Sequence, residues 1–420
     1  MAEEGIEVRG AHEEALEHAV EHRTPMAQEA GRPPVDLGTI DQGRVSFPPN
    51  EAGTESAGGQ PPNPDAPGER VGVAVLGLGK LALEQVLPAF AECKHARLAG
   101  LISGTPAKLQ AVARQYGVPA DSCYSYADMA RLRDNPAIKI VYVITPNALH
   151  RRDTIAAARA GKHVLCEKPM SVSAADARAM IAACRQAGVL LMIGYRMQYQ
   201  PHARDLIRMA RAGKLGQVTL MDMIDNQNQG DPTQWRQVKA LAGGGSLPDV
   251  GLYCLNTSRA ILGEEPVAVT AQIWSPQGDD RFREVEDNVA FTLRFPSGAI
   301  SNCMSSYSNH RLTRLTLSGS EAWAEMSHAF DYRGQSLRVA RLEDGKDQVA
   351  EREIEAKNQF ALELDHMAEC VRANRTPRTP GEEGLQDQII MEAIYEAART
   401  GRTVMLPQVA RRDAFRGAEG

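Results

Sequence analysis

Residues 71–82 have the sequence V-G-V-A-V-L-G-L-G-K-L-A. The apolar first half is typical of a buried parallel strand, and residues 81–91 have the periodicity of a helix. Between them, Gly77 permits a tight turn and Gly79 lets a pyrophosphate approach the backbone, while Ala82 is small enough for the helix to pack on the strand. The pattern predicts a dinucleotide-binding turn with the phosphates at the helix N-terminus, where unpaired N–H groups favour anions. A glycine turn with only a structural role is the alternative.

Strands and helices alternate as far as residue 195, which predicts a doubly wound parallel sheet, an α/β domain of the Rossmann type over residues 71–195. The expected strands are 71–76, 97–103, 138–145, 163–166 and 189–194, and the expected helices are 81–92, 106–116, 126–133, 148–160 and 173–187. In such a sheet the ligand binds outside the carboxyl ends of the strands. Residues at those ends are therefore the first candidates for a site.

The pattern changes after residue 195, where strands follow one another and two of them are joined by a hairpin turn at 296–298. Their apolar and polar residues alternate, as in a sheet with one covered face. The expected strands are 217–226, 266–275, 286–295, 299–306, 312–318 and 321–327. We expect an α+β domain with an open, mostly antiparallel sheet over residues 196–402 and a C-terminal tail over 403–420. Two amphipathic helices, 359–373 and 384–399, are expected to cover this second sheet.

Residues 1–70 differ in composition from the rest of the chain. They hold nine of the 24 prolines and a net charge of −9, against −6 for the whole chain of 420 residues. Such a polar segment cannot bury enough surface to fold alone, so we expect an extended proline-rich arm. It is either a disordered tail or it orders against another surface, such as a neighbouring subunit. A short acidic helix over 13–23 would place His18 and His22 one turn apart, where a solvated helix face is favoured over a metal site.

The composition argues against several classes of protein. Residues 71–420 carry only a small positive surplus, so we expect no nucleic-acid partner, and no apolar run is long enough to cross a membrane. The seven cysteines are scattered without a C-x-x-C pair, so we expect buried free thiols and neither a disulfide framework nor a metal site. The first thirty residues do not have the pattern of an export signal. We therefore expect a cytoplasmic protein, or a periplasmic one if a signal is missing.

The end of the second strand bears on the choice of cofactor. An enzyme that uses NAD usually has an acid there to accept from the ribose 2′-hydroxyl, but this sequence runs L-I-S-G at 101–104. Ser103 and Lys108 offer a hydroxyl and a cation instead, and both suit a 2′-phosphate. We therefore expect NADP in preference to NAD. Taken singly, Lys108 fits equally well as a solvated lysine on the next helix.

Lys168 lies at the carboxyl end of a buried strand, in the E-K-P motif at 167–169, and so at the mouth of the predicted crevice. Burying an ammonium group is costly unless something there uses its charge, which favours a functional role over a surface turn. The T-P-N sequence at 145–147 leaves the neighbouring strand close to where a nicotinamide would lie. Asn147 could equally cap the following helix, and His150, one turn further on, could be structural.

The second domain contains the glycine-rich segment G-G-G-S-L-P-D-V-G-L-Y at 243–253, which predicts a flexible loop that leads into a helix. Ser246 is expected to cap this helix, which should run to Leu262. Asp249 and Tyr253 then stand at i and i+4, one turn apart on one face. The alternative is an exposed charge and an amphipathic tyrosine with no shared role.

Several short motifs together have the order and spacing of a known family. They are V-L-G-L-G-K-L-A-L at 75–83, E-K-P at 167–169, G-Y-R at 194–196, Q-W-R at 234–236, the glycine-rich segment at 243–253, E-V-E-D at 284–287, S-S-Y-S at 305–308 and P-G-E-E-G at 380–384. They resemble the Gfo/Idh/MocA family, which includes glucose–fructose oxidoreductases and inositol dehydrogenases. The likeness extends from about Arg70 to Arg402. It implies a Rossmann domain followed by an open-sheet domain, assembled as a homodimer or homotetramer.

The resemblance also implies roles for individual residues. Lys168 and Tyr253 would be the catalytic pair, Asp249 would orient the sugar, and Tyr195 would lie near the nicotinamide, so that these four contact the substrate. The residues implied to bind the cofactor are Gly77, Leu78, Gly79, Lys80, Leu81, Ser103, Gly104, Lys108, Thr145, Pro146, Asn147, His150, Glu167, Lys168, Arg196, Trp235 and Arg236. The family further implies NADP that is held very tightly and a proline-rich arm that clamps the cofactor of a neighbouring subunit.

The residue types fit oxidation of a sugar at C1 to the lactone, which removes a hydride and a proton. A phenol is a weak acid, so Tyr253 needs a neighbouring cation to serve as the base, and Lys168 could supply it. We consider an NADP-retaining enzyme that oxidises an aldose and reduces a second sugar, aldose or ketose, to its alditol. The alternatives are a conventional NADP-dependent aldose dehydrogenase and a non-catalytic NADP-binding sensor. A sensor has no need of Lys168, Asp249 and Tyr253 together, so the first hypothesis is favoured.

Overall fold

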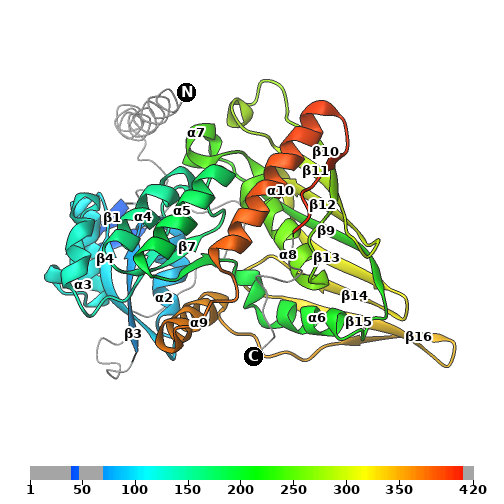
Figure 1. Cartoon of the computed structure of the whole chain (residues 1–420), viewed down its shortest axis with the longest axis horizontal. Helices are drawn as coiled ribbons and strands as arrows, with labels where there is room; N and C mark the ends of the chain where they lie inside the picture. Colours follow the sequence, from blue (N-terminus) through cyan, green and yellow to red (C-terminus); the bar gives the residue numbers. More distant parts are fainter. Residues whose placement is uncertain (1–38, 47–69, 410–420) are drawn as a thin grey trace.

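The computed structural model describes residues 39–46 and 70–409. Two sheets organise this part of the chain, a six-stranded one on the left of Figure 1 and a nine-stranded one on the right. The helix expected at 13–23, with His18 and His22, lies outside the described residues. The division of the chain into four segments remains a prediction.

The six-stranded sheet is parallel throughout, and its strand order is β5-β4-β3-β6-β7-β8. The strands are β3 (Val71–Leu76), β4 (Ala96–Ile102), β5 (Cys123–Tyr124), β6 (Ile140–Val143), β7 (His163–Glu167) and β8 (Leu191–Gly194). Helices α2 (Leu87–Ala89), α3 (Pro106–Tyr116), α4 (His150–Arg159) and α5 (Ala174–Ala187) connect them, with a short 3₁₀ turn η2 (Ala120–Ser122). The predicted doubly wound sheet is confirmed. Its order reverses between β3 and β6, which puts the crevice at their carboxyl ends.

The turn after β3 needs its glycines for two different reasons. Gly77 has a φ of +96°, and a Cβ there would lie 2.7 Å from the carbonyl oxygen of Ile144. A Cβ on Gly79 would meet nothing within 4 Å, so this glycine faces open space. The following helix begins with a π-helical turn, η1 (Ala82–Val86), before α2.

One expected α-helix of this domain is a 3₁₀ helix. Residues 126–133 lie in η3 (Tyr126–Asp134), in which only Met129 and Leu132 are buried. Buried residues three positions apart match the period of a 3₁₀ helix. Because a single pair at this spacing also fits an α-helix, the sequence predicted a helix here but not which type. The next helix, too, starts with a 3₁₀ turn, η4 (Asn147–Leu149), before α4.

The nine-stranded sheet has the order β16-β15-β14-β13-β9-β12-β11-β10-β17. Its strands are β9 (Val218–Asn228), β10 (Ala268–Trp274), β11 (Asn288–Arg294), β12 (Ile300–Ser306), β13 (Ser308–Gly319), β14 (Ala322–Ser327), β15 (Ser336–Glu343), β16 (Lys346–Glu351) and β17 (Val404–Met405). Only β9 and β12 pair in parallel, so the predicted open, mostly antiparallel sheet is confirmed. β17 was not expected, because it lies in the segment interpreted as a tail.

Short helical elements accompany this sheet. They are η5 (Arg196–Gln198), α6 (Pro201–Arg211), η6 (Trp235–Gln237), α7 (Lys239–Ala242), η7 (Leu247–Gly251), α8 (Leu252–Leu262) and η8 (Asp280–Phe282). The sequence analysis missed α6, β15 and β16. Every residue of β16 is exposed, so this strand lacks the alternation that identifies a half-covered strand.

The two C-terminal helices do not both cover the second sheet, and the expectation was wrong for α9 (Gln359–Ala373). Phe360, Leu364 and Met367 of this helix belong to the core cluster that includes Val73 and Val75 of β3, so α9 packs on the Rossmann domain. Helix α10 (Gly381–Thr400) contacts β10 of the second sheet and also α5 and β8 of the first. An amphipathic pattern shows that a helix has an apolar face but not which sheet that face covers.

The described part of the arm forms a hairpin of β1 (Thr39–Asp41) and β2 (Arg44–Ser46). Val45 packs against the core cluster of the Rossmann domain, and β2 contacts α3. In Figure 1 this hairpin lies beside the six-stranded sheet. The helix that it contacts is the one that carries Lys108.

Candidate active site

A cavity of about 760 Å³ lies at the carboxyl ends of the parallel strands and is lined by residues of both sheets. Every residue implied to bind the cofactor lines it, from the turn after β3, the ends of β4, β6 and β7, and the elements η5 and η6. Lys168, Asp249 and Tyr253 line it as well. Stretches that are far apart in the sequence, from both domains, thus meet in one cavity.

Tyr195 is the exception among the expected site residues. It does not line the cavity, because its side chain is only 2% exposed and belongs to a core cluster. Its hydroxyl is directed toward Asp387 of α10. The strand end places the backbone of Tyr195 near the crevice, but tertiary packing turns the side chain away from it.

The end of β4 places Ser103 and Lys108 in the cavity wall, and both side chains are buried. The Ser103 hydroxyl accepts a hydrogen bond from the backbone N–H of Thr105 at 3.2 Å. Glu84 is an acid that also lines this region, which the sequence analysis did not single out. Burial raises the pKa of Glu84, against the opposing charge of Lys80.

The residues after β6 are held by backbone groups. His150 is buried, with Nδ1 2.9 Å from the Pro169 carbonyl oxygen and Nε2 2.7 Å from that of Thr145. Asn147 does not cap the helix; its Nδ2 donates to the carbonyl oxygen of Ala242 at 2.8 Å. This bond joins the crevice edge of the Rossmann domain to α7 of the second domain.

Lys168 forms a buried ion pair with Asp249. Its Nζ donates to Oδ1 of Asp249 at 2.9 Å and to the Asp249 carbonyl oxygen at 2.6 Å, and it lies 4.5 Å from the centre of the Tyr253 ring. Burial disfavours the ammonium form, but the charge of Asp249 and its hydrogen bond, together with Tyr253 and Glu167, outweigh burial and raise the pKa of Lys168. Lys168 is therefore a permanent cation at neutral pH, and it cannot serve as the base.

Asp249 is held from several sides at once. Besides the bond from Lys168, its Oδ2 accepts from the Tyr307 hydroxyl at 2.7 Å and from Nε of Arg236 at 3.2 Å. Burial would raise the pKa of Asp249, but Lys168 and Arg236 outweigh it and hold that pKa below its ordinary value. The carboxylate thus stays charged and fixed, with its side chain 18% exposed.

The hydroxyl of Tyr253 has a partner that the sequence analysis did not foresee. Nε of Arg196 donates to this hydroxyl at 2.8 Å, and the guanidinium lies 4.3 Å from the ring centre. Arg196 is itself fixed by bonds to Gln359 and to the carbonyl oxygen of Phe330. The implied pair of Lys168 and Tyr253 is therefore a triad, in which lysine lies over the ring and arginine binds the oxygen.

Glu167, the first residue of the E-K-P motif, is also in the cavity wall. It accepts a hydrogen bond from the Tyr142 hydroxyl at 2.6 Å, and that hydroxyl lies 3.4 Å from Glu363 of α9. Burial raises the pKa of Glu167 and, together with the charge of Glu167, that of Glu363. The docking of α9 thus brings a second carboxyl group to the strand end that carries Lys168.

The glycines at 243–245 allow close packing and do not form a loose loop. A Cβ on Gly244 would lie 1.9 Å from the Tyr395 hydroxyl, and one on Gly245 would lie 1.9 Å from the carbonyl oxygen of Glu286. Ser246 does not cap the helix, since it is already in the helical region and its hydroxyl lies 3.0 Å from that of Ser305. This packing fixes the start of η7, which carries Asp249.

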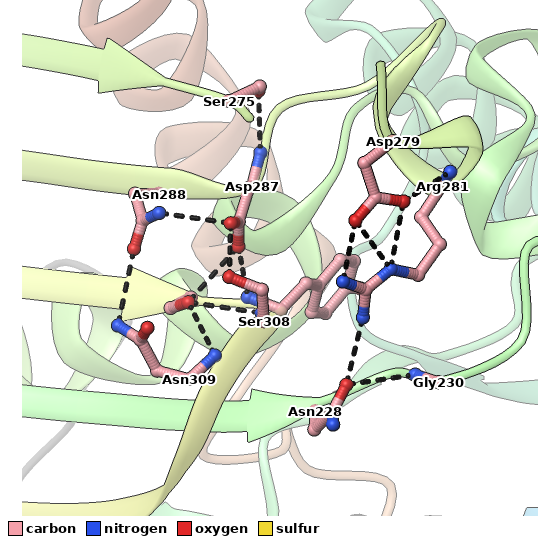
Figure 2. Close-up of polar contacts among 11 residues, drawn as sticks. Asn228, Gly230, Ser275, Asp279, Arg281, Asp287, Asn288, Ser308 and Asn309 are labelled. Carbon is pink, nitrogen blue, oxygen red and sulfur yellow. Dashed lines mark hydrogen bonds and ion pairs between the residues drawn. The ribbon is translucent and has the colours of Figure 1, made fainter. Parts of the chain in front are cut away.

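A second polar cluster fixes the turn between β12 and β13, which carries Tyr307 (Figure 2). The Asp287 carboxylate accepts from the backbone N–H of Tyr307 at 2.8 Å, from Asn288 at 3.0 Å, and from the hydroxyls of Ser306 and Ser308. Because the Tyr307 hydroxyl in turn binds Asp249, Asp287 positions the site without touching the cavity. The E-V-E-D and S-S-Y-S motifs contained both residues, but their sequence did not show that they meet.

Residues 39–46 and 70–409 contain no group of three potential metal-ligating side chains, and no helix of this part of the chain has the length and apolar character of a membrane span. All seven cysteines are free, and six of them are buried, as expected.

Comparisons with known proteins give the site a context. Residues 71–195 match a family model described as an oxidoreductase family with an NAD-binding Rossmann fold, and residues 203–325 match the Gfo/Idh/MocA C-terminal domain. A D-xylose 1-dehydrogenase (NADP+) of Haloarcula marismortui is 31% identical over 343 residues, which are 79% of this chain and 92% of that protein. The crystal structure of an aldose-aldose oxidoreductase from Caulobacter crescentus, complexed with glycerol, is 50% identical, with a TM-score of 0.77 over 80% of this chain and 100% of that one.

Proposed function

The chain belongs to the Gfo/Idh/MocA family of oxidoreductases, and from that premise we propose that it oxidises an aldose at C1 to the lactone with NADP and then reduces a second sugar to its alditol with the same bound cofactor. The chain is a sugar oxidoreductase with an NAD(P)-binding fold. Its choice of NADP, the retention of that cofactor and the pair of sugars belong to the proposal. The observation that carries it is the Tyr253 hydroxyl, held by Arg196 beside Lys168 in the same cavity as the glycine turn.

The cavity residues fit a nicotinamide dinucleotide with a 2′-phosphate. The open space in front of Gly79 leaves room for a pyrophosphate against the backbone. Ser103 and Lys108 would hold the 2′-phosphate, and the residues after β6 would lie along the nicotinamide. When bound, NADP supplies the chemistry of accepting and returning a hydride. Glu84 is the one acid in the region of the glycine turn, and the charge of Lys80 offsets it.

The side chains of the chain itself account for the proton and for the pose of the sugar. The Tyr253 hydroxyl accepts from Arg196 and donates to no described residue, so its proton can exchange with an oxygen of the substrate. Lys168 and Arg196, both cations, stabilise negative charge on that hydroxyl when it acts as the base. For reduction of the second sugar, Tyr253 gives the proton back to a carbonyl oxygen. Asp249, fixed by Lys168 and Tyr307, offers an acceptor that orients a sugar hydroxyl.

A conventional NADP-dependent aldose dehydrogenase, which exchanges its cofactor in each turnover, is the second candidate. The D-xylose 1-dehydrogenases (NADP+) among the relatives favour it. The aldose-aldose oxidoreductase, at 50% identity, favours cofactor retention. The two candidates share every residue discussed above and differ only in the rate at which the cofactor leaves.

The near-ultraviolet spectrum of the desalted protein separates the candidates. We expect bound cofactor after desalting, a reduced-nicotinamide band after addition of glucose without added NADP, and loss of that band after addition of a ketose or a second aldose. A protein that is empty after desalting and needs added NADP for each turnover would be the conventional dehydrogenase. Cofactor that no aldose reduces would contradict both candidates.

A further inference from the structure

The wall of the cavity contains a carboxyl group that the chemistry above does not use. Asp225 lies on β9 and lines the cavity, but only 5% of the residue is exposed. Within residues 39–46 and 70–409, no group donates a hydrogen bond to its carboxyl oxygens. A buried polar group without a partner is costly, and a group that faces a cavity can find its partner in a ligand.

The positively charged side chains around Asp225 form their hydrogen bonds with other residues. Three cations, Arg196, Arg311 and Lys168, favour the ionised form of Asp225 by their charge, and the like charge of Asp331 disfavours it. Lys168 is bound to Asp249, Arg196 to Tyr253, and Nη2 of Arg311 to Oδ1 of Asp331 at 2.7 Å. The cations therefore attract the Asp225 carboxyl group without forming a hydrogen bond to it.

Asp225 is the first of three polar residues on one face of the chain at this point. Residues at i, i+2 and i+4 of a strand point to the same side, and Asp225, Gln227 and Gln229 all line the cavity. Gln227 donates to Oδ2 of Asp249 at 3.4 Å. The row of three side chains is therefore in contact with the group of residues around the Tyr253 hydroxyl. Neighbours in the row are about 7 Å apart along the strand, which lets them contact hydroxyl groups at different positions of one sugar ring.

We propose that Asp225, Gln227 and Gln229 form the sugar-binding wall of the cavity and that Asp225 binds a hydroxyl group of an uncharged sugar. This inference rests on the proposed function, because it assigns the substrate side of the same site. A carboxyl group and two amides match a polyol, whose hydroxyls both donate and accept. Lys168, Arg236 and Arg311 are paired with carboxylates, and Arg196 is bound to the Tyr253 hydroxyl, so each cation of this region is already engaged within the chain and is poorly placed to serve a sugar acid or a sugar phosphate.

The electrostatic setting of Asp225 supports a hydroxyl ligand. Burial raises the pKa of Asp225 to about 8, although Arg196, Arg311 and Lys168 oppose the shift. The carboxyl group is then largely protonated at neutral pH, so it can donate to one sugar oxygen and accept from another hydroxyl. A charged ligand would gain little from such a group.

The test compares Asp225→Ala and Asp225→Asn with Asp222→Asn in the full-length, NADP-loaded protein. Asp222 lies on the same strand but on its other face, where it pairs with Arg314 at 3.2 Å. We expect Asp225→Ala to raise KM for the preferred aldose about tenfold or more, with a smaller change in kcat and an unchanged Kd for NADP. Asp225→Asn should raise KM less, and Asp222→Asn should leave all three constants within about twofold of the wild type.

A second arm tests the class of sugar. The wild type should prefer an aldose to the uronic acid of the same configuration, and Asp225→Asn should narrow that preference at about pH 9, because the wild-type carboxyl group is ionised at that pH and repels a carboxylate. A wild-type KM in Asp225→Ala, or an unchanged preference in Asp225→Asn, would overturn this inference and leave the proposed function intact. If the wild type oxidised no aldose, and calorimetry of the NADP-loaded protein detected no binding of an uncharged sugar, both the function and this inference would be wrong.

Discussion

Three residues at the centre of the cavity have different tasks, and the difference follows from their partners. Lys168 pairs with Asp249 and remains a cation, whereas the Tyr253 hydroxyl accepts from Arg196 and keeps an exchangeable proton. Asp249 stays ionised because Lys168 and Arg236 flank it. In the proposed mechanism the proton-transfer role therefore belongs to Tyr253, and the other two residues set the charge around it.

The first prediction concerns the Tyr253 hydroxyl. Tyr253→Phe should keep the fold and the bound cofactor but lower kcat by about 10²- to 10⁴-fold, the usual contribution of a general acid or base. Steady-state oxidation of glucose and the occupancy of bound nicotinamide would be measured on the same preparation. Tyr332→Phe removes another hydroxyl from the same cavity without breaking the bond to Arg196 and should cost less than about tenfold. Near-normal turnover in Tyr253→Phe would remove this residue from the mechanism.

The second prediction concerns Lys108, which is buried in the cavity wall beside Ser103. Lys108→Ala should weaken NADP far more than NAD, since only NADP carries the additional phosphate. Lys80→Ala is the matched control, because Lys80 lies at the glycine turn and should affect both dinucleotides alike. Fluorescence titration of cofactor-free protein gives the four dissociation constants. An equal loss for NADP and NAD in Lys108→Ala would refute the assignment of the 2′-phosphate.

The third prediction concerns the stability of the ligand-free protein as a function of pH. The pKa of Asp225 is about 8 in the folded chain, above its ordinary value in the unfolded chain, so the folded state binds more protons between these two values. Stability from this group is therefore present at low pH and is lost as the pH rises toward 8. Asp225→Asn has no such carboxyl group. From pH 5 to pH 8.5, its free energy of unfolding should therefore rise relative to that of the wild type by at least about 1 kcal/mol. Urea unfolding at the two pH values checks this, and a constant difference would contradict it.

At the scale of elements, the turn between β12 and β13 connects the second sheet to the site. Asp287 binds the residues of this turn (Figure 2). The turn carries Tyr307, whose hydroxyl binds Asp249. Arg281 ties the preceding loop to the end of β9 through Asn228, at 2.9 Å. The sheet therefore provides more than a cover for the cavity, since its strand ends fix the position of Asp249, the carboxylate that we propose orients the sugar.

The fourth prediction compares two acids of this cluster. Asp287→Asn places an amide among four donors and should lower the free energy of unfolding by about 1–3 kcal/mol, the cost of a buried group that loses its partners. It should also raise KM for the sugar, because Tyr307 then holds Asp249 less firmly. Asp279→Asn weakens the ion pair with Arg281, in which Asp279 is 26% and Arg281 20% exposed, but the amide oxygen can still accept from the backbone N–H of Arg281, so the variant should cost under about 1 kcal/mol. Equal effects of the two variants would contradict a special role for Asp287.

At the scale of the whole molecule, the two sheets meet at the cavity, and the β1–β2 hairpin of the arm lies on the outside of the Rossmann domain. The hairpin of β1 and β2 contacts α3, the helix that carries Lys108, through a core contact of Val45. The arm is therefore anchored close to the region proposed for the 2′-phosphate. We propose that it slows the release of the cofactor and contributes to the contact between subunits of a homodimer or homotetramer.

The fifth prediction tests the arm with two truncations. Deletion of residues 1–65 removes the hairpin and should leave hydride transfer intact, but cofactor should be lost on a desalting column and the oligomer mass should fall. Deletion of residues 1–38 keeps the hairpin, so the protein should retain more of its bound cofactor and more of its oligomer mass than after deletion of residues 1–65. Bound nicotinamide and mass by light scattering are measured for each. Full occupancy and an unchanged mass after deletion of 1–65 would leave the arm without either role.

The sequence by itself determined the features that depend on neighbours along the chain. The glycine turn, the strands of the first domain and the residues at their ends were predictable because strand periodicity is local and parallel strands share one carboxyl edge. This is why the implied cofactor residues of the first domain line the cavity, whereas Arg196, Trp235 and Arg236, which also line it, were implied only by the family resemblance. The alternation of apolar residues likewise predicted the second sheet, except where β16 is exposed on both faces.

Only the tertiary structure decided which side chains meet. Arg196 and Tyr253 are 57 positions apart, and Tyr142 and Glu363 are 221 apart, so no local pattern links them. Three further features depend on how the elements pack. They are the docking of α9 on the first domain, the burial of the Tyr195 side chain away from the cavity, and the cavity-lining position of Asp225, Gln227 and Gln229. Periodicity shows that a residue has a buried side, but the complementary surface that it packs against is formed by distant parts of the chain.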